Sequence, residues 1–181
     1  MMWPEDKLDR WVRALQEGQV VAAPAEGVYG YCVDPFNENA LKRLVEKKGR
    51  SVDKGLIILV RDFSEMKEMT RIITEGEKEV IYHSWPGHTT IIFLAKSTLS
   101  PLLTGGRDTI ALRMPSEKYM QEYLTAWGGP LVSTSLNRAG ERPVTEAEKV
   151  PENIISLRLA EKLSGRESKI YDALNYSWIR N

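Results

Sequence analysis

The stretch KKGRSVDKGLIILV, residues 47–60, places four cationic side chains directly before five consecutive apolar residues. The preceding segment Glu38–Lys48 predicts a helix, because its apolar residues recur one turn apart and its final lysines suit the negative end of the helix dipole. Gly49 is expected to end this helix. The run Leu56–Val60 is too short for a helix, and its branched side chains predict a strand buried on both faces.

Lys48, Arg50 and Lys54 are therefore expected in a loop at the edge of a sheet. Loops held by a rigid scaffold often carry binding residues, and clustered cations suit the oxygens of a polyphosphate. The alternative is a solvated basic turn, since most charged runs lie on the surface. Both interpretations of this loop remain open at the level of the sequence.

Composition sets limits on the class of protein. A chain of 181 residues is long enough to form one domain with a substantial core, and we expect one domain over residues 1–181. Lys plus Arg equals Asp plus Glu at 25 each, which disfavours a surface built wholly for nucleic acid. One cysteine and two histidines are too few for a structural zinc site or an internal disulfide.

The N-terminal residues are charged where a secretory signal would be apolar. No apolar run approaches the ~20 residues that a membrane helix needs. We therefore expect a cytoplasmic protein that has no membrane partner.

Strand patterns alternate with helix patterns along the chain. This order predicts an α/β sheet covered on both faces by helices, with a site at the strand ends. Neither G-x-x-x-x-G-K-[ST] nor G-x-G-x-x-G is present, so a nucleotide site would need another design. Helices are expected at 4–18, 38–48, 61–73, 74–85, 99–103, 116–127 and 152–163, strands at 20–23, 56–60, 89–95, 109–114, 131–134 and near 170 or 178–180, and a loop at 25–30.

Ser133–Asn137 (STSLN) gathers three hydroxyls and an amide at the end of a predicted strand. Such a cluster can bind phosphate or carboxylate oxygens, although the same residues also form Asx and Ser turns. No histidine or acid lies nearby in sequence to activate a serine, which disfavours a catalytic triad. The cluster is a candidate oxyanion site.

Arg113 lies among apolar neighbours in the strand pattern TIALRM. A buried arginine must pair with an internal acid or with an anionic ligand, and both remain open here. Cys32 could act as a nucleophile, but a free cysteine is more often a small buried apolar residue.

Several runs, in order, resemble the YrdC/TsaC family of threonylcarbamoyl-AMP synthases along nearly the whole chain. They are VVAAPAEGVYGYCVDP, EKKGRSVDKGLIILV, SWPGHTTIIFLA, TIALRMPSE, GPLVSTSLNRAG and ESKIYDALNYSWIRN. The resemblance implies a YrdC-like α/β domain, a mixed twisted sheet flanked by helices, with a concave basic cavity. It also implies formation of threonylcarbamoyl-adenylate and pyrophosphate from L-threonine, bicarbonate and ATP, for threonylcarbamoyladenosine in tRNA.

The resemblance also implies roles for individual residues. The catalytic and phosphate-binding residues would be Lys48 and Arg50, supported by Lys54, and the nucleotide would be held by Ser135, Asn137 and Arg180. The threonine or carbamate end would be lined by Tyr29, Arg113, Ser133 and Ser168. Mg²⁺ would bridge the phosphates without a dedicated protein site. RNA or a tRNA-modifying transferase complex would be the macromolecular partner.

Four positions depart from the family's usual motifs. Ala25 and Gly27 replace two threonines that flank the acid of the first motif, His88 stands where a second proline is usual, and Leu136 replaces an alanine. We therefore expect a roomier, less polar pocket beside Glu26 and weaker selectivity for threonine. The alternatives are a YciO-like paralogue with an altered substrate, and an RNA-binding or nucleotide-binding domain without synthase activity.

Overall fold

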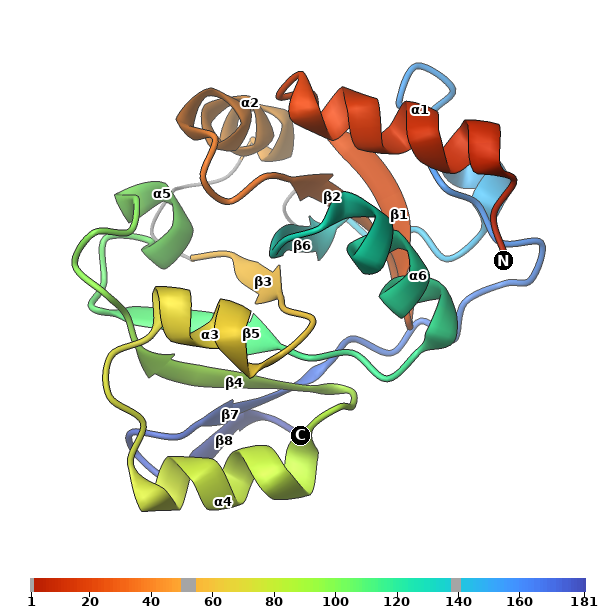
Figure 1. Ribbon diagram of the computed structural model, residues 1–181. Helices are drawn as coiled ribbons and strands as arrows, with labels where there is room; N and C mark the ends of the chain where they lie inside the picture. The colour runs from red at the N-terminus through yellow and green to blue at the C-terminus, as the bar shows by residue number, and fades with distance from the viewer. Residues whose placement is uncertain (1, 50–54, 138–140) are drawn as a thin grey trace.

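The computed structural model describes residues 2–49, 55–137 and 141–181. Within these ranges, eight strands form one sheet in the order β1-β2-β6-β3-β5-β4-β7-β8 (Figure 1). The pairs β3/β5 and β4/β7 are parallel, whereas the other neighbouring pairs are antiparallel. The predicted α/β fold with a mixed sheet flanked by helices is confirmed.

The bounds of the elements follow the sequence patterns closely in most places. The strands are β1 (Val21–Ala25), β2 (Val28–Val33), β3 (Ile57–Leu59), β4 (Thr89–Leu94), β5 (Thr109–Arg113), β6 (Leu131–Ser135), β7 (Lys169–Asp172) and β8 (Ser177–Arg180). The helices are α1 (Glu5–Gln16), α2 (Glu38–Lys48), α3 (Phe63–Met69), α4 (Glu75–Ser84), α5 (Pro101–Thr104) and α6 (Lys118–Trp127), with a 3₁₀ turn η2 (Ala147–Lys149).

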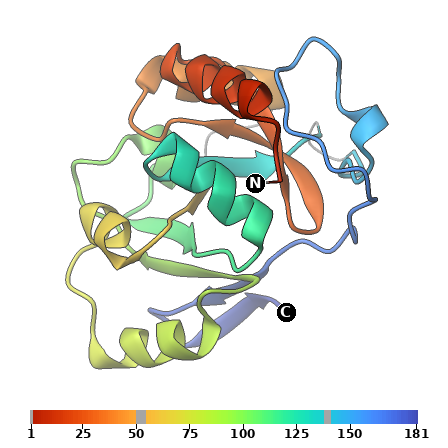
Figure 2. The ribbon, with the colours of Figure 1, turned by 45° about the vertical axis from the view of Figure 1, so that its right-hand side comes forward.

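Helices lie along both ends of the sheet. Figures 1 and 2 show α1 and α2 beside the β1–β2 end, and α4 beside the opposite end, near β7 and β8. Helix α6 connects β5 to β6, which lie on either side of β3 in the sheet. The two strands that the C-terminal pattern left as alternatives are both present, as an antiparallel pair.

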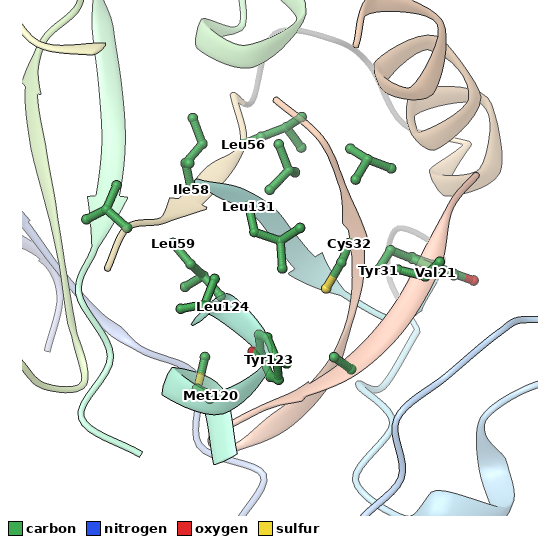
Figure 3. Close-up of a cluster of buried hydrophobic side chains, with 14 of the residues drawn as sticks. Val21, Tyr31, Cys32, Leu56, Ile58, Leu59, Met120, Tyr123, Leu124 and Leu131 are labelled. Carbon is green, nitrogen blue, oxygen red and sulfur yellow. The ribbon is translucent and has the colours of Figure 1, made fainter. Parts of the chain in front are cut away.

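The core joins the first and sixth helices to the sheet. The indole N–H of Trp11 donates to the carbonyl of Ala22 at 2.9 Å, and its ring packs against Tyr123 at 5.4 Å between centroids. Figure 3 shows Met120, Tyr123 and Leu124 of α6 beside Leu59 and Leu131 of the central strands. Burial of these apolar side chains is the main force that holds the layers together.

Helix α2 begins and ends as its sequence predicts. The side chain of Asn37 accepts a hydrogen bond from the Ala40 N–H at 3.0 Å, which satisfies one free donor of the first turn. Gly49 adopts φ 56°, the left-handed conformation that terminates helices at low cost for glycine. Because this helix stops at a defined residue, Lys48 has a defined position.

The predicted loop at residues 25–30 is wrong for most of its length, because Ala25 belongs to β1 and residues 28–30 belong to β2. Val28 pairs with Ala25, so Glu26 and Gly27 form a two-residue turn between β1 and β2. The two glycines of this segment favoured a loop. However, β2 pairs with β1 on one side and with β6 on the other, and the hydrogen bonds of both pairs stabilise a strand that contains glycine.

The predicted helix at residues 152–163 is also wrong. This segment is extended beside β1, where the Leu157 N–H donates to the carbonyl of Ala22 at 3.0 Å. The guanidinium of Arg158 donates to the carbonyls of Ala147 and Val150, at 3.1 and 3.0 Å. Tertiary hydrogen bonds thus replace the helical ones that the apolar spacing suggested.

In the described residues, none of the helices combines the length and apolar character needed to span a bilayer.

Replacement of Ile58 by alanine should destabilise the fold strongly. Ile58 is 0% exposed in β3 and is flanked by Leu112 and Val132, so truncation leaves a cavity that costs ~2–5 kcal/mol. Ile72→Ala is the matched control, because Ile72 is 92% exposed and surface changes stay within about 0.5 kcal/mol. Urea denaturation measures both, and equal midpoints for the two variants would contradict the assignment of β3 to the core.

Candidate active site

A cavity of about 410 Å³ lies over one face of the sheet. In the strand register Ile57 pairs with Ala111 and with Ser133, so these three side chains lie on the same face and all line the cavity. Ile92, which pairs with Ala111, continues this surface. We expected a sheet covered on both faces, with the site at the ends of the strands. Instead, the cavity lies over residues in the middle of the strands, whose side chains are small or moderate in size and leave this part of the face uncovered.

The polar lining of the cavity comes from strands that are far apart in sequence. It contains arginines from β5, β8 and the turn before β5, serines from β6 and from the start of β7, and one acid beside them among the described lining residues. These residues are Arg107, Arg113, Ser133, Ser135, Glu167, Ser168 and Arg180. The structure thus brings together five residues predicted for the site, Arg113, Ser133, Ser135, Ser168 and Arg180.

Lys48 connects α2 to the end of β6. Its ammonium group donates to the carbonyls of Ser135 and Asn137 at 2.6 and 2.8 Å, and to Asn137 Oδ1 at 3.0 Å. Lys48 is the last residue of α2 and only 4% exposed, so the expectation that it lies in a loop, and the alternative of a solvated turn, are both wrong for this residue. Arg50 and Lys54 lie outside the described residues.

The STSLN cluster forms the turn that its sequence suggests and also lines the cavity. The Ser135 hydroxyl donates to Asn137 Oδ1 at 2.6 Å, and the Asn137 amide donates to the carbonyl of Glu141 at 2.7 Å. Ser133 and Ser135 both line the cavity. Local turn bonds and Lys48 therefore position hydroxyls that remain beside the cavity.

The last two strands supply a second polar group. Arg180 Nε donates to the carbonyl of Ser168 at 2.7 Å, and Arg180 Nη1 forms an ion pair with Glu167 at 2.6 Å. The hydroxyl of Ser168 lies 2.9 Å from that of Thr90 on β4, within hydrogen-bond distance. These contacts fix Ser168 and Arg180 at one edge of the cavity.

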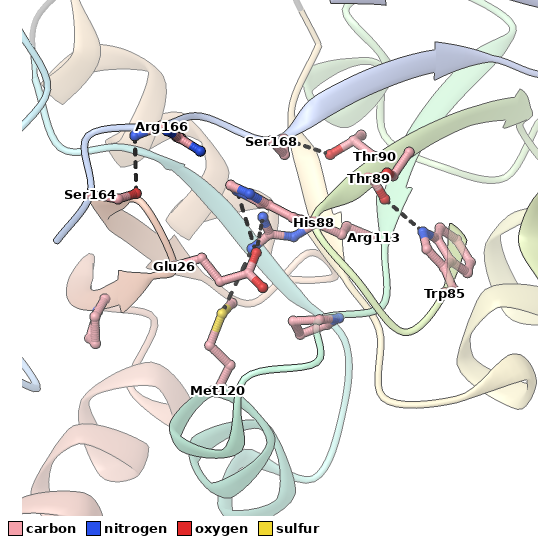
Figure 4. Close-up of polar contacts among 12 residues, drawn as sticks. Glu26, Trp85, His88, Thr89, Thr90, Arg113, Met120, Ser164, Arg166 and Ser168 are labelled. Carbon is pink, nitrogen blue, oxygen red and sulfur yellow. Dashed lines mark hydrogen bonds and ion pairs between the residues drawn. The ribbon is translucent and has the colours of Figure 1, made fainter. Parts of the chain in front are cut away.

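Arg113 pairs with an internal acid and also lines the cavity (Figure 4). Its Nη1 lies 2.9 Å from Glu26 Oε2, and its Nη2 contacts the sulfur of Met120 at 3.8 Å. Arg113 is 4% exposed, and burial lowers the pKa of its guanidinium while the charge of Glu26 opposes that shift. Burial likewise raises the pKa of Glu26, against the effect of Arg113.

Glu26 is a site residue that the sequence pattern did not single out as a partner of Arg113. The acid lies between β1 and β2, and nothing in the spacing connects it to β5. The sequence did indicate that a buried arginine needs an acidic partner, but it could not indicate which acidic residue that partner is. His88 is similar, because its side chain approaches Glu26 and nothing in the sequence pattern connects the two residues.

Tyr29 and Cys32 are buried in the sheet. Tyr29 is 0% exposed, is absent from the described cavity lining, and its hydroxyl accepts a hydrogen bond from the Leu159 N–H at 3.0 Å. Burial raises the pKa of the Cys32 thiol to about 12, so the nucleophilic thiolate does not form at neutral pH. The contacts of both residues are those of core side chains.

Gly27, which stands where the family usually has a second threonine, does not make the pocket beside Glu26 larger. A Cβ atom on Gly27 would lie 1.6 Å from the carbonyl oxygen of Arg166, and the Gly165 N–H donates to the carbonyl of Gly27 at 2.8 Å. The backbone of residues 165–166 fills the space that a side chain would need. The expectation of extra room at Gly27 is therefore wrong, and a threonine could not be introduced there without moving this segment.

This architecture is that of a one-sheet α/β protein with a cavity lined by arginines and hydroxyls. The family Sua5/YciO/YrdC, whose model carries the description "Telomere recombination", matches residues 13–180, and the chain belongs to this family. A protein named threonylcarbamoyl-AMP synthase from Vibrio vulnificus is 36% identical over 181 residues, 96% of this chain and 97% of that protein. One of the same name from Photobacterium profundum is 34% identical over 97% of this chain and 98% of that protein.

Solved structures give the same result for the fold. P. abyssi Sua5 complexed with L-threonine matches with a TM-score of 0.85 and 30% identity, covering 93% of this chain and 51% of that chain. The present chain thus spans about half the length of the P. abyssi protein. E. coli YciO matches with a TM-score of 0.80 over 93% of this chain and 84% of its own, and at 22% identity this likeness shows the fold alone.

Replacement of Gly27 by alanine should destabilise the protein by ~1–3 kcal/mol, because the new Cβ collides with the Arg166 carbonyl and the backbone must move. Gly129→Ala is the matched control, since the nearest atom to its Cβ is the Trp127 side chain at an ordinary 3.6 Å. Denaturation midpoints of both variants test this. A Gly27→Ala variant as stable as Gly129→Ala would show that segment 165–166 does not pack here.

Proposed function

We propose that this protein is a threonylcarbamoyl-AMP synthase, a nucleotidyltransferase formed by one domain over residues 1–181. It would convert L-threonine, bicarbonate and ATP into threonylcarbamoyl-adenylate and pyrophosphate, in the cytoplasm, for the modification of tRNA. Relatives that carry this name match almost the whole chain at 34–36% identity. A protein of the same fold at 30% identity forms a complex with L-threonine.

One observation carries the proposal: the cavity places the Arg113 guanidinium and the hydroxyls of Ser133, Ser135 and Ser168 around one space. In adenylyl transfer a carbamate oxygen attacks the α-phosphorus and pyrophosphate leaves. The protein must then position two anions and stabilise charge on oxygen atoms. Cations and hydroxyls on a rigid sheet supply these interactions without a nucleophilic residue.

The family resemblance implies a division of the cavity into two parts, which meet where Arg180 contacts Ser168. Arg113, Ser133 and Ser168 would bind the carboxylate of threonine and the carbamate. Ser135, Asn137 and Arg180 would hold the nucleotide, with the phosphates near Lys48, Arg50 and Lys54. Ser133 and Ser135 are two residues apart on one strand face, or ~7 Å along β6, so both can contact a single bound intermediate.

Mg²⁺ would enter this cavity on the phosphates of ATP. Among the described residues, no group of three or more histidine, cysteine, aspartate or glutamate side chains is placed to hold a metal ion. Mg²⁺ commonly binds through substrate phosphates with few protein ligands, and this donor set fits that mode. When bound, the ion would neutralise charge on the phosphate oxygens.

Purified protein given ATP, Mg²⁺, bicarbonate and L-threonine should release pyrophosphate, and omission of threonine or bicarbonate should abolish the release. Serine and valine in place of threonine measure selectivity. No release above background with threonine would refute the synthase. Salt-sensitive tRNA binding without turnover would favour the RNA-binding alternative, and turnover with another amino acid would favour a YciO-like paralogue.

Replacement of Lys48 by alanine should lower kcat/KM for ATP roughly 10²-fold, because its ammonium group holds the Ser135–Asn137 turn in place beside the cavity and misplaced binding groups can cost that much. It should also lower stability by ~1–3 kcal/mol, because the carbonyls of Ser135 and Asn137 lose their donor. Arg50→Ala should lower kcat/KM similarly. Lys42→Ala is the control, since Lys42 is an exposed lysine on the same helix. Wild-type kcat/KM in the Lys48 and Arg50 variants would remove both from the site.

A further inference from the structure

Three charged or titratable side chains meet beside the cavity with unsatisfied polar atoms. His88 Nε2 lies 3.4 Å from Glu26 Oε2, and the same oxygen lies 2.9 Å from Arg113 Nη1 (Figure 4). Glu26 Oε2, His88 Nε2 and Arg113 Nε are all buried, and none makes a hydrogen bond of good geometry. The ion pair with Arg113 compensates Glu26 Oε2, whereas His88 Nε2 and Arg113 Nε have no hydrogen-bond partner, and a buried polar atom without one costs free energy.

The backbone at Glu26 is held in an unfavourable conformation. Glu26 has φ 65°, one of two positive values among the described non-glycine residues. The two-residue turn between β1 and β2 requires this conformation, because such hairpin turns place their first central residue at positive φ. Here it carries the carboxylate from the β1–β2 turn to Arg113 and His88, while the neighbouring Ala25 lines the cavity.

His88 connects this group to solvent. It precedes β4, and its backbone carbonyl accepts a hydrogen bond from the Lys169 N–H at 3.1 Å. Its side chain keeps 36% of its surface exposed, although Nε2 is buried against Glu26. The imidazole therefore touches water on one side and the carboxylate on the other.

The electrostatic surroundings bring the proton affinities of Glu26 and His88 closer together. Burial raises the pKa of Glu26, while burial, Arg113 and Arg180 lower the pKa of His88 and Glu117 opposes that shift. The other titratable groups nearby are the phenols of α6, Tyr119 and Tyr123, whose pKa values burial raises. A carboxyl group and an imidazole that face each other in this way can exchange a proton.

We propose that Glu26 is the general base that accepts the proton lost by the substrate amine, and that His88 passes this proton to solvent. The inference rests on the proposed function, because only a reaction at an amine needs such a base. His88 is then a positioning and proton-transfer residue that acts through Glu26. In the resting state of this proton path, His88 Nε2 makes no hydrogen bond and faces the Glu26 carboxylate.

The step balances as follows. An N–H bond of the threonine ammonium breaks, its proton moves to the Glu26 carboxylate, and the freed amine attacks the carbon of bicarbonate. The N–C bond forms, a second N–H bond and a C–O bond of bicarbonate break, and the hydroxyl group leaves as water with the second amine proton, giving the carbamate. The new Glu26 O–H then donates its proton to His88 Nε2 while His88 Nδ1–H releases one to water, which restores the Glu26 carboxylate and leaves His88 as its Nε2–H tautomer. Proton exchange with water then returns His88 to the Nδ1–H tautomer.

The test is His88→Ala assayed for pyrophosphate release across pH, with and without added imidazole. We expect kcat/KM for threonine to fall roughly 10²-fold, the lower end for loss of proton transfer, and imidazole to restore part of it in proportion to its neutral form. His83→Ala is the matched control, since His83 is the chain's other histidine and lies on α4 away from Glu26. It should retain wild-type kcat/KM and be insensitive to imidazole.

Two further variants keep the inference falsifiable. His88→Asn fills the site with a side chain that cannot accept the proton, so it should lose activity even if the alanine variant is unstable. Glu26→Gln should lose activity and should not respond to imidazole. A pH profile of His88→Ala and His88→Asn that matches the wild type, or loss without imidazole rescue in a folded His88→Ala, would overturn the proton path.

The wild-type protein separates the two proposals. If it releases no pyrophosphate with threonine, the proposed function fails and the proton path fails with it. If it turns over normally while the His88 variants match it, the synthase stands and the proton path alone is refuted. ATP affinity measured by calorimetry should be equal in wild type and His88→Ala, which confines the effect to the amine.

Discussion

A guanidinium in the middle of a sheet requires a counter-charge, and at Arg113 that requirement organises the site. Removal of a charge from water costs several kcal/mol, and the ion pair with Glu26 offsets part of this cost. The pair joins β5 to the turn between β1 and β2. In the sheet, β6 and β3 lie between β5 and β2. The positive φ of Glu26 belongs to this two-residue turn, and residues 165–166 pack tightly against the neighbouring Gly27.

The cavity exists because small side chains meet on one sheet face. Ala111 and Ser133 flank Ile57 in the register, so no bulky group fills the space above the central strands. On the ends of the same face, Lys48 fixes the turn after β6 while Glu167 and Thr90 hold Arg180 and Ser168. A rigid scaffold of this type can hold binding groups without a change of conformation, which is the condition for electrostatic stabilisation.

The sequence pattern predicted most elements because their signals are local. Helix α2 has its Asn37 cap, its apolar stripe and its terminal Gly49 within a few residues of one another. The same reasoning failed at residues 152–163, where apolar spacing suggested a helix but hydrogen bonds to Ala22 made an extended chain more stable. Five of the predicted site residues do line the cavity, yet Tyr29 is buried with its hydroxyl bonded to Leu159.

The sequence by itself determined the family, the α/β class and the residue types of the site. These depend on the order of short motifs and on short-range periodicity, which are local properties of the chain. Only the tertiary structure decided that Arg113 pairs with Glu26, that His88 approaches this acid, and that Lys48 is buried against β6. These contacts join residues that are 62 to 89 positions apart. Burial and charge select such pairs in three dimensions, and no local pattern specifies which acid will meet which base.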